Sequence, residues 1–244
     1  MSDRMQHHTL LVHPQFQELS TFVASIPSRM ERGEGEVIYK GRNELRKMEY
    51  QGRWYVVKSF RKPHLLNQLV YGIGLRASKA KRAYLNGCAL LDIGVPNPQP
   101  IGYIEVRPFV LLSQSYFVSA LSDCPYTWKD ITDGTLPCTE AVCREVGRIT
   151  ALLHNHQLAL KDHSRGNILF KVVKDKVQLQ LVDLNRMYHG KIDMQRGCKN
   201  FDRLPATPQM QRWMAEAYAA ERGMDVAQCY ALICAFRKKQ EGKY

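Results

Sequence analysis

The chain has 244 residues, of which 45% are hydrophobic and 24% are charged, a composition that excludes a disordered or fibrous protein. No apolar run is long enough to cross a bilayer, and the N-terminal residues lack the apolar core of a signal peptide, so we expect a cytoplasmic location. The seven cysteines never follow a Cys-x-x-Cys spacing, which favours reduced thiols over a zinc site or a disulfide framework.

The net charge of +12 comes from 35 Lys and Arg against 23 Asp and Glu. A surplus of this size favours an anionic partner, such as a phosphorylated lipid or sugar, a membrane surface or nucleic acid. A solvated basic surface without such a partner would have the same charge. The charge alone therefore does not choose among these alternatives.

The first half of the chain is predicted to be rich in strands. Apolar residues at helical spacing predict a short helix over 14–26 and a longer one over 76–91. Alternating and β-branched runs predict strands, with turns at 40–43 and 51–52. The predicted strands of this half cover residues 37–39, 45–50, 54–60, 101–106 and 115–119.

The second half is predicted to be rich in helices, because its apolar residues recur at helical spacing. The predicted helices cover residues 139–156, 207–222 and 225–238, and two strands are expected at 168–173 and 177–182. With a hinge at 120–124, this order of elements predicts an α+β fold in two lobes. We expect a β-rich N-terminal lobe of residues 1–122 and an α-rich C-terminal lobe of residues 123–244.

A polar loop between a predicted helix and a strand holds the strongest functional pattern. Asp162 and Asn167 are five residues apart, the spacing of the kinase catalytic loop D-x-x-x-x-N. The carboxylate can accept the proton of a substrate hydroxyl, and the amide oxygen can ligate magnesium. Asp183 then ends a strand as a lone acid, where a second magnesium ligand is expected.

The candidate nucleotide-binding residues lie in the first half. Val56-Val57-Lys58 resembles the V-A-I-K strand of kinases, in which the lysine binds the α- and β-phosphates of ATP. Gly41 and Arg42, in the turn before it, are candidates to contact a phosphate, although a plain hairpin turn fits them equally well. Each match alone is weak, because these residues are also common in loops and on surfaces. Their shared order, spacing and context favour a kinase-like fold.

The sequence resembles the lipopolysaccharide kinase family (Kdo kinase/WaaP-like), whose members phosphorylate glycolipids of the Gram-negative envelope. The resemblance spans about residues 37–240 and is most specific over 160–187. The matching stretches are KGRNEL (40–45), VVKSF (56–60), IGVPNPQPIGYIE (93–105), SYFVSALSDCPYT (115–127), LKDHSRGNILF (160–170), LVDLNRM (181–187) and CKNFDRLPATP (198–208).

The resemblance implies a bilobal protein-kinase-like fold that uses ATP and Mg²⁺ to phosphorylate a sugar hydroxyl of a lipopolysaccharide precursor. It assigns the base to Asp162, the metal ligands to Asn167 and Asp183, and the nucleotide lysine to Lys58. One departure concerns the helix after Lys58, because relatives have a glutamate near the position of Leu85. Another is Leu160, which stands where kinases have a histidine two residues before the base.

A basic run follows the predicted lysine strand, and it consists of Arg61, Lys62, Arg76, Lys79, Lys81 and Arg82. These cations could dock the protein on anionic lipid headgroups at the inner face of the inner membrane. The same segment has an apolar patch of Leu65, Leu66, Leu69, Val70 and Ile73, which suits a membrane-resting surface. Simple packing and solvation explain both features equally well.

The prediction is an ATP- and Mg²⁺-dependent kinase that acts on a sugar of a lipopolysaccharide precursor. The missing helix glutamate and the single glycine of the 40–43 turn favour one alternative, a pseudokinase that binds nucleotide or docks a partner. A kinase acting on a protein or a small molecule is another. Nucleic acid is not expected as a partner, because nothing besides charge indicates RNA binding.

Overall fold

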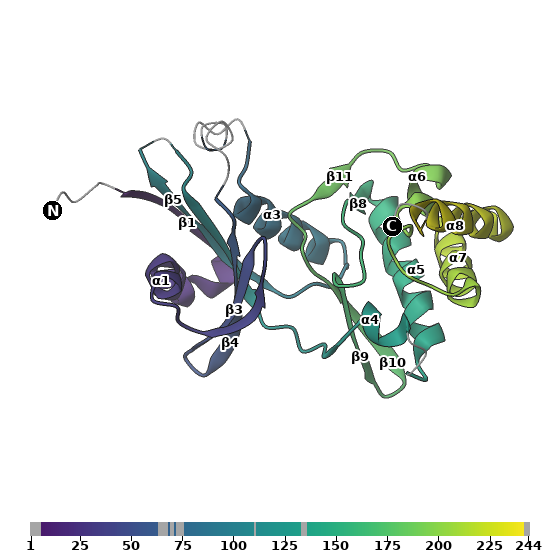
Figure 1. Cartoon of the computed structure of the whole chain (residues 1–244), viewed down its shortest axis with the longest axis horizontal. Helices are drawn as coiled ribbons and strands as arrows, with labels where there is room; N and C mark the ends of the chain where they lie inside the picture. The colour runs from purple at the N-terminus through teal and green to yellow at the C-terminus, as the bar shows by residue number, and fades with distance from the viewer. Residues whose placement is uncertain are drawn as a thin grey trace. The chain divides into compact units, whose positions relative to one another are not determined.

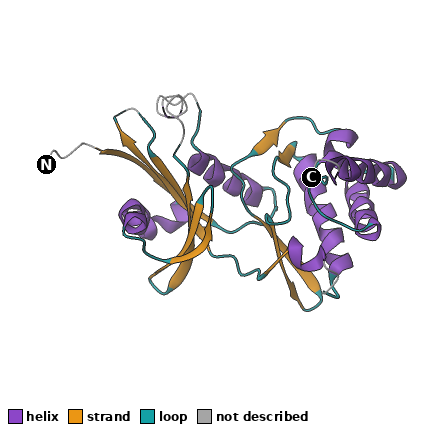
Figure 2. Cartoon of the chain, viewed as in Figure 1, coloured by secondary structure: helices purple, strands orange, loops and turns teal. Residues whose placement is uncertain are grey.

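The computed structural model describes residues 6–62, 68, 71, 76–109, 111–132 and 136–241. It is a mixed α+β structure, so the predicted fold class is confirmed (Figures 1 and 2). The chain forms two compact units. The first comprises Met1–Cys88 and Pro98–Leu121, and the second comprises Ala89–Asn97 and Ser122–Tyr244. The predicted apolar patch of Leu65, Leu66, Leu69, Val70 and Ile73 lies outside the described residues.

The first unit is built on an antiparallel sheet of six strands in the order β1-β5-β6-β4-β3-β2. Its strands are β1 (Gln6–Val12), β2 (Glu36–Lys40), β3 (Glu44–Tyr50), β4 (Arg53–Phe60), β5 (Pro100–Pro108) and β6 (Gln114–Ala120). The 3₁₀ helix η1 (Pro14–Leu19) and α1 (Ser20–Glu31) precede β2, and α3 (Lys79–Asp92) follows β4. The β4 strand lies between β3 and β6, so its side chains alternate between the two faces of the sheet.

The two faces of this sheet pack against different helices. Phe22 and Ile26 of α1 are fully buried in one cluster with Val57 of β4. On the other face, Tyr84 of α3 packs in a second cluster with Phe60 of β4. Burial of these apolar side chains holds each helix on its side of the sheet.

The second unit is mainly helical, as Figure 2 shows. Its helices are α4 (Trp128–Thr132), α5 (Thr139–Asn155), α6 (Met194–Lys199), α7 (Pro208–Arg222) and α8 (Val226–Glu241). Its short strands are β7 (Tyr126–Thr127), β8 (Leu158–Leu160), β9 (Ile168–Val173), β10 (Lys176–Leu181) and β11 (Met187–His189). β9 pairs with β7 and β10, and β8 pairs with β11 to form a two-stranded ribbon.

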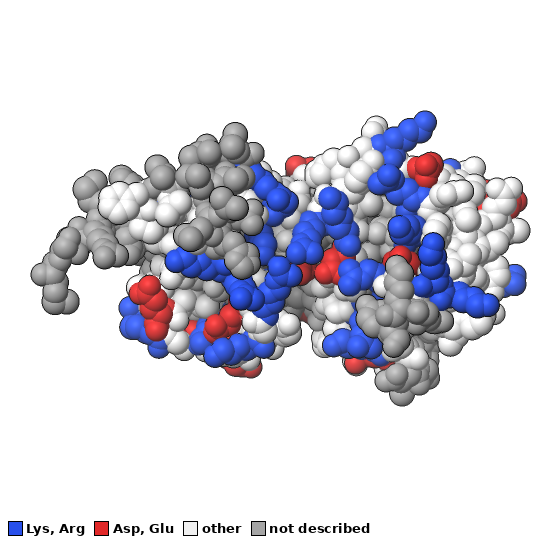
Figure 3. All heavy atoms as spheres, turned by 45° about the horizontal axis from the view of Figure 1, so that its top comes forward, with Lys and Arg blue, Asp and Glu red and all other residues white. Residues whose placement is uncertain are grey.

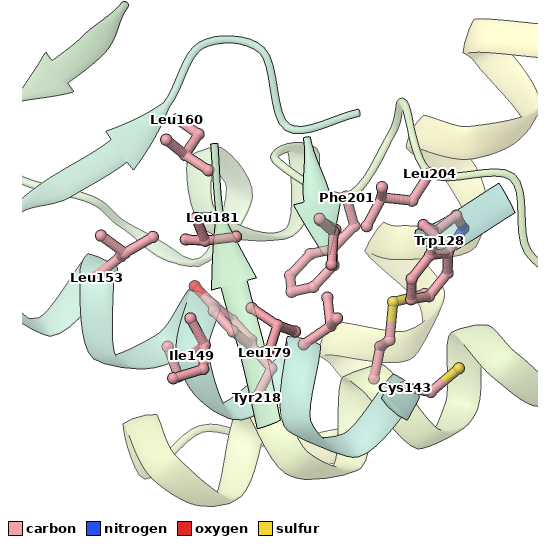
Figure 4. Close-up of a cluster of buried hydrophobic side chains, with 14 of the residues drawn as sticks. Trp128, Cys143, Ile149, Leu153, Leu160, Leu179, Leu181, Phe201, Leu204 and Tyr218 are labelled. Carbon is pink, nitrogen blue, oxygen red and sulfur yellow. The ribbon is translucent and has the colours of Figure 1, made fainter. Parts of the chain in front are cut away.

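Lys and Arg side chains are prominent on the surface in the view of Figure 3, in keeping with the net charge of +12. Beneath this surface, the second unit has an apolar core in which α5 and α7 pack together (Figure 4). Gly147 permits their close approach, because a Cβ atom there would lie 2.5 Å from the carbonyl oxygen of Met214. Trp128 is fully buried in this core and donates from Nε1 to the carbonyl of Pro205 at 2.8 Å.

Several short elements, among them α4, α6, β7, β8 and β11, were not predicted, and two differences in the first unit have a visible cause. The predicted helix over 14–26 is divided, because Phe16 has non-helical dihedrals within η1, and α1 continues to Glu31. β1 was not predicted, since Gln6-His7-His8-Thr9 lacks an alternating apolar pattern. It pairs with β5 in a complete antiparallel register, from Gln6 opposite Pro108 to Val12 opposite Gly102, and so becomes an edge strand of the sheet.

Candidate active site

The loop that holds Asp162 begins at the end of the two-stranded ribbon. β8 pairs with β11 so that Leu160 lies opposite Met187, and both side chains are buried. The backbone N–H of Lys161 continues this ladder by donating to the carbonyl of Arg186 at 3.1 Å. Asp162 therefore follows a paired strand directly, and this pairing fixes the position of the first residues of its loop.

Asp162 forms an ion pair with an arginine that lies far from it in the sequence. Nη1 of Arg203 donates to Oδ1 of Asp162 at 2.7 Å. The Asp162 side chain is 32% exposed, so solvent and a small molecule can reach it. The cation of Arg203 gives the carboxylate a preferred orientation.

Asn167 closes the Asp162 loop. Its Nδ2 donates to the carbonyl of Asp162 at 2.8 Å, and its backbone N–H donates to the carbonyl of Ser164 at 2.9 Å. Because the carbonyl of Asp162 can only accept, the amide nitrogen faces it, and Oδ1 is the atom of Asn167 that could ligate a cation. The N–H of Val182 donates to the carbonyl of Asn167 at 3.0 Å, which brings Asp183 beside the loop.

Asp183 has an unusual backbone conformation at the end of β10. Its φ is +61°, in the left-handed region that Asp and Asn tolerate better than other side chains with a Cβ. Residues held in such conformations concentrate at functional sites. Nδ2 of Asn185 donates to Oδ1 of Asp183, which fixes the orientation of the carboxylate. The second unit thus brings together Asp162, Asn167 and Asp183.

A largely buried hydrogen-bond network, centred on Asn200, fixes the backbone of this loop. Asn200 donates from Nδ2 to the carbonyl of Leu160 at 2.7 Å, and its own carbonyl accepts from Nδ1 of His163 at 3.1 Å. Its Oδ1 must then accept from Nε2 of His154, at 3.1 Å. Nδ1 of His154 is consequently the acceptor for the hydroxyl of Tyr218, at 2.9 Å.

Both histidines of this network are kept neutral by burial. Desolvation lowers the pKa of His154 to about 3, against which the bond to Asn200 acts weakly. Desolvation also lowers the pKa of His163 to about 4, although the carbonyl of Asn200 and the charge of Asp162 act in the opposite direction. A neutral imidazole can donate on one side and accept on the other, as the network requires.

The sequence did not predict a role at this site for Arg203, Asn185, Asn200, His154, His163 or Tyr218. The only signal for Arg203 and Asn200 was their place in the matching stretch CKNFDRLPATP, to which the resemblance gave no role. Asn185 lies in the matching stretch LVDLNRM, two residues after the predicted Asp183.

The first unit brings the predicted nucleotide-binding residues to one end of its sheet. Lys58 lies opposite Leu45 of β3 and Phe117 of β6, on the face that α3 covers, and its Nζ is 5.4 Å from the ring centroid of Phe60. Gly41 and Arg42 lie in the exposed connection between β2 and β3. This connection is tied to the end of β4, because Oδ1 of Asn43 accepts from the N–H of Arg61 at 3.3 Å.

The side chains of α3 that face the sheet near Lys58 include no Asp or Glu. Ala80, Ala83 and Tyr84 of α3 face the sheet, and all three are buried. Leu85 is 47% exposed, so a side chain at position 85 would not face the sheet. No Asp or Glu occurs in the sequence of α3 before its last residue, Asp92.

The donor atoms of the second unit fit magnesium rather than a softer metal. Asn167 and Asp183 supply hard oxygen ligands, and Mg²⁺ completes its shell with waters and substrate phosphates. In the described ranges, no cluster of three His, Cys, Asp or Glu that could hold a metal occurs.

None of the helices within those ranges is long and apolar enough to span a bilayer.

The fold of this chain resembles the folds of two solved structures. WaaP in complex with acyl carrier protein superposes with a TM-score of 0.65 at 17% sequence identity, covering 97% of this chain and 99% of that chain. A proposed aminoglycoside phosphotransferase from Ralstonia eutropha superposes with a TM-score of 0.52 at 12% identity, covering 89% of this chain and 86% of that chain. No family model matches the sequence, and no curated protein matches it. At these identities the likeness concerns the fold, and the chain has the protein-kinase-like fold.

Proposed function

We propose that the protein is a phosphotransferase that uses ATP and Mg²⁺ to phosphorylate a hydroxyl group. The observation that carries this proposal is the bond network that joins Asn167 to the carbonyl of Asp162 and to the residue before Asp183. It supports the proposal because it brings Asp162, the proposed base, and Asn167 and Asp183, the proposed metal ligands, into one loop cluster. Phosphoryl transfer needs this set of groups, because catalysis depends on positioning and on stabilising charge.

In this proposal each residue of the second unit has a separate role. Asp162 accepts the proton of the attacking hydroxyl while Arg203 orients its carboxylate. Oδ1 of Asn167 and the carboxylate of Asp183 would hold Mg²⁺, which neutralises charge on the phosphates when it is bound. Residues 123–244 form the lobe for catalysis and acceptor binding.

Residues 1–122 form the nucleotide lobe in this proposal. Lys58 would contact the α- and β-phosphates, and the connection with Gly41 and Arg42 would lie over the phosphates. The tie between Asn43 and Arg61 supports this assignment, because it keeps that connection beside the end of β4. A lysine of this kind acts as a point charge that binds phosphate without fixing its geometry.

The proposed acceptor is a sugar hydroxyl of a lipopolysaccharide precursor. The sequence resemblance supports this class, as does a fold similar to that of WaaP over 97% of the chain. Such an acceptor is anchored in a bilayer, so the enzyme would work as a peripheral protein at the inner face of the inner membrane. The exposed cations Arg61, Arg76 and Lys81 of the first unit would assist that contact.

The test compares acid-to-amide variants in an assay of phosphate transfer from Mg-ATP. Asp162→Asn and Asp183→Asn should each lower kcat by at least about 100-fold and leave the thermal midpoint close to the wild-type value. Asp175→Asn is the matched control, because Asp175 has the same φ of +61° in an exposed turn of the same unit. Full activity in either of the first two variants would refute the assignment.

A pseudokinase is the second candidate, and the acid-free sheet-facing side of α3 favours it. The sheet-facing side of α3 supplies no carboxylate to position Lys58, whereas the corresponding helix of active kinases supplies a glutamate. Thermal-shift titration with Mg-ATP, together with phosphate-release measurements, separates the two functions. Stabilisation that Lys58→Met abolishes, without turnover on any acceptor, would establish the pseudokinase.

A further inference from the structure

The two-stranded ribbon beside Asp162 carries two cations that face each other. Lys161 and Arg186 continue the β8–β11 register by one pair, and their backbones are joined by the 3.1 Å bond described above. Residues directly opposite each other on antiparallel strands point to the same face, with Cβ atoms about 5 Å apart. Both side chains are exposed.

Like charges in this arrangement destabilise a ribbon unless an anion compensates them. Neither Lys161 nor Arg186 forms an ion pair with any residue in the described part of the chain. Some exposed cations of the same unit are paired, as Arg144 is with Glu140 and Glu216, and Arg148 is with Glu145. The ribbon instead places two cations directly opposite each other beside Asp162, and neither is paired with a carboxylate of the described residues.

A third cation extends this surface along β11. Tyr188 lies two residues from Arg186, about 7 Å along the strand, and on the same side of the ribbon because buried Met187 separates them. The guanidinium of Arg196 in α6 stacks over the Tyr188 ring at 4.3 Å from the centroid. This cation–π contact holds Arg196 in place, and Figure 3 shows Lys and Arg side chains on the surface that carries β11 and α6.

We infer that Lys161, Arg186 and Arg196 form a subsite for a phosphate group carried by the acceptor. The inference rests on the proposed function, because it assigns the subsite to the substrate whose hydroxyl meets Asp162. Lys161 and Asp162 are consecutive, so their Cα atoms are about 3.8 Å apart, and a phosphate bound by Lys161 would lie within the span of a phosphorylated sugar from Asp162. The subsite thereby selects an acceptor that already has a phosphate near the hydroxyl to be modified.

The test uses glucose 6-phosphate and glucose as probes, measured by isothermal titration calorimetry with the full chain at low salt. Saturating Mg-ADP is present, so that phosphate does not enter the nucleotide site. Wild type should bind glucose 6-phosphate and not glucose. Lys161→Gln/Arg186→Gln should weaken this binding by about tenfold or more, because charge-assisted hydrogen bonds to the phosphate are lost.

The matched control is Lys174→Gln/Lys176→Gln, which removes the same charge from the exposed β9–β10 turn and the first residue of β10. It should change the dissociation constant by less than about twofold. An equal loss in this control, or equal binding of glucose and glucose 6-phosphate by wild type, would overturn the subsite. So would a ribbon variant that keeps glucose 6-phosphate binding but no longer binds phosphatidylglycerol vesicles, because the cations would then serve a membrane surface.

The outcome is separable from that of the proposed function. Calorimetry reports the subsite without any turnover, whereas the Asp162→Asn comparison reports phosphate transfer. Wild type that binds glucose 6-phosphate through the ribbon but never transfers phosphate would refute the kinase and keep the subsite. If the ribbon variant keeps wild-type phosphate transfer and wild-type binding of glucose 6-phosphate, the kinase stands and the subsite is refuted.

Discussion

The carbonyl of Asn200 accepts a hydrogen bond from Nδ1 of His163, the residue that directly follows Asp162, at 3.1 Å. The side-chain amide of the same asparagine donates to the carbonyl of Leu160 at 2.7 Å. One residue thus binds the chain on both sides of Asp162. Leu160 needs no side-chain hydrogen bond for this purpose, because its backbone makes the contact.

Replacing Asn200 by Asp should disturb the position of Asp162. A carboxylate cannot donate to the carbonyl of Leu160, and the two oxygens would repel each other. We expect kcat to fall by about tenfold or more with little change in KM for ATP, and the free energy of unfolding to fall by about 1–3 kcal/mol. Steady-state kinetics and urea unfolding measure the two effects.

Asn155→Asp is the control for the Asn200 variant. Asn155 is exposed and also donates from Nδ2 to a backbone carbonyl, that of Glu221, at 3.2 Å. It should keep wild-type kcat, because Asn155 lies at the end of α5 and does not touch the loop. Equal losses of kcat in both variants would show that Asn200 has no particular effect on Asp162.

The ion pair between Arg203 and Asp162 should matter for activity and little for stability. Both side chains are partly exposed, 43% for Arg203 and 32% for Asp162, and exposed ion pairs contribute about 0–1 kcal/mol. Arg203→Gln should therefore barely shift the thermal midpoint. It should lower kcat by about tenfold, because the carboxylate loses its orientation.

Arg144→Gln provides the comparison for the Arg203 variant. Arg144 is 42% exposed and is paired with Glu140 and Glu216 in the same unit. The two variants should resemble each other in stability and differ in kcat. A kcat for Arg203→Gln that equals that of Arg144→Gln would mean that the ion pair does not orient Asp162.

Acid should destabilise the second unit through its two buried histidines. As the pH falls below 6.5, the unfolded chain binds protons at both, whereas folded His163 and His154 remain neutral until about pH 4 and 3. Unfolding then takes up protons, so stability falls with pH, by about 2 kcal/mol per histidine between pH 7 and 5. Urea unfolding at a series of pH values measures this loss.

His163→Gln should lose less stability than wild type over the same interval, because one of the two proton-binding sites is gone. Gln can still donate to the carbonyl of Asn200. His156→Gln should lose as much as wild type, since His156 is exposed in the folded chain. If His163→Gln and wild type decline equally, His163 does not carry the predicted share.

Gly197 should not tolerate a side chain. A Cβ atom at this position would lie 1.9 Å from the hydroxyl of Tyr218 and 3.2 Å from Nδ1 of His154. Gly197→Ala must push the hydroxyl away from its partners His154 and Arg222, so we expect a loss of about 3 kcal/mol. Gly166→Ala should cost much less, because a Cβ there meets no atom within 4 Å.

The double variant Gly197→Ala/Tyr218→Phe tests this explanation. Removing the Tyr218 hydroxyl also removes the atom with which the new methyl group collides. The double variant should therefore lose less stability than the sum of the two single variants, as measured in a double-mutant cycle of urea unfolding. Simple additivity would show that the collision is not the cause.

Part of the site follows from local sequence. Asp162 and Asn167 lie within one loop, and Asp183 follows a strand whose alternation of Gln178, Leu179 and Gln180 is visible in the residues. Such spacings report local geometry, because the turn and the strand period act over a few residues. The α+β class follows for the same reason from the periodicity of each segment.

Other parts of the site depend on tertiary packing. Arg203 reaches Asp162 across 41 residues, and Asn200 reaches Leu160 across 40. Periodicity predicts which face of a helix is buried, but it does not predict which side chain that face meets. The opposed cations Lys161 and Arg186 likewise appear only when β8 pairs with β11.

The sequence by itself determined the α+β fold class, because residue periodicity is a short-range property, and it predicted Asp162, Asn167 and Asp183 as site residues. Only the tertiary structure decided how Asp162 is held. That role belongs to the bonds of Asn200 and Arg203, which exist because the segment after α6 packs beneath the loop. Tertiary packing in the first unit likewise shows that position 85 lies on the exposed side of α3, since the orientation of this helix is set by the apolar cluster of Ala80, Ala83 and Tyr84 against the sheet.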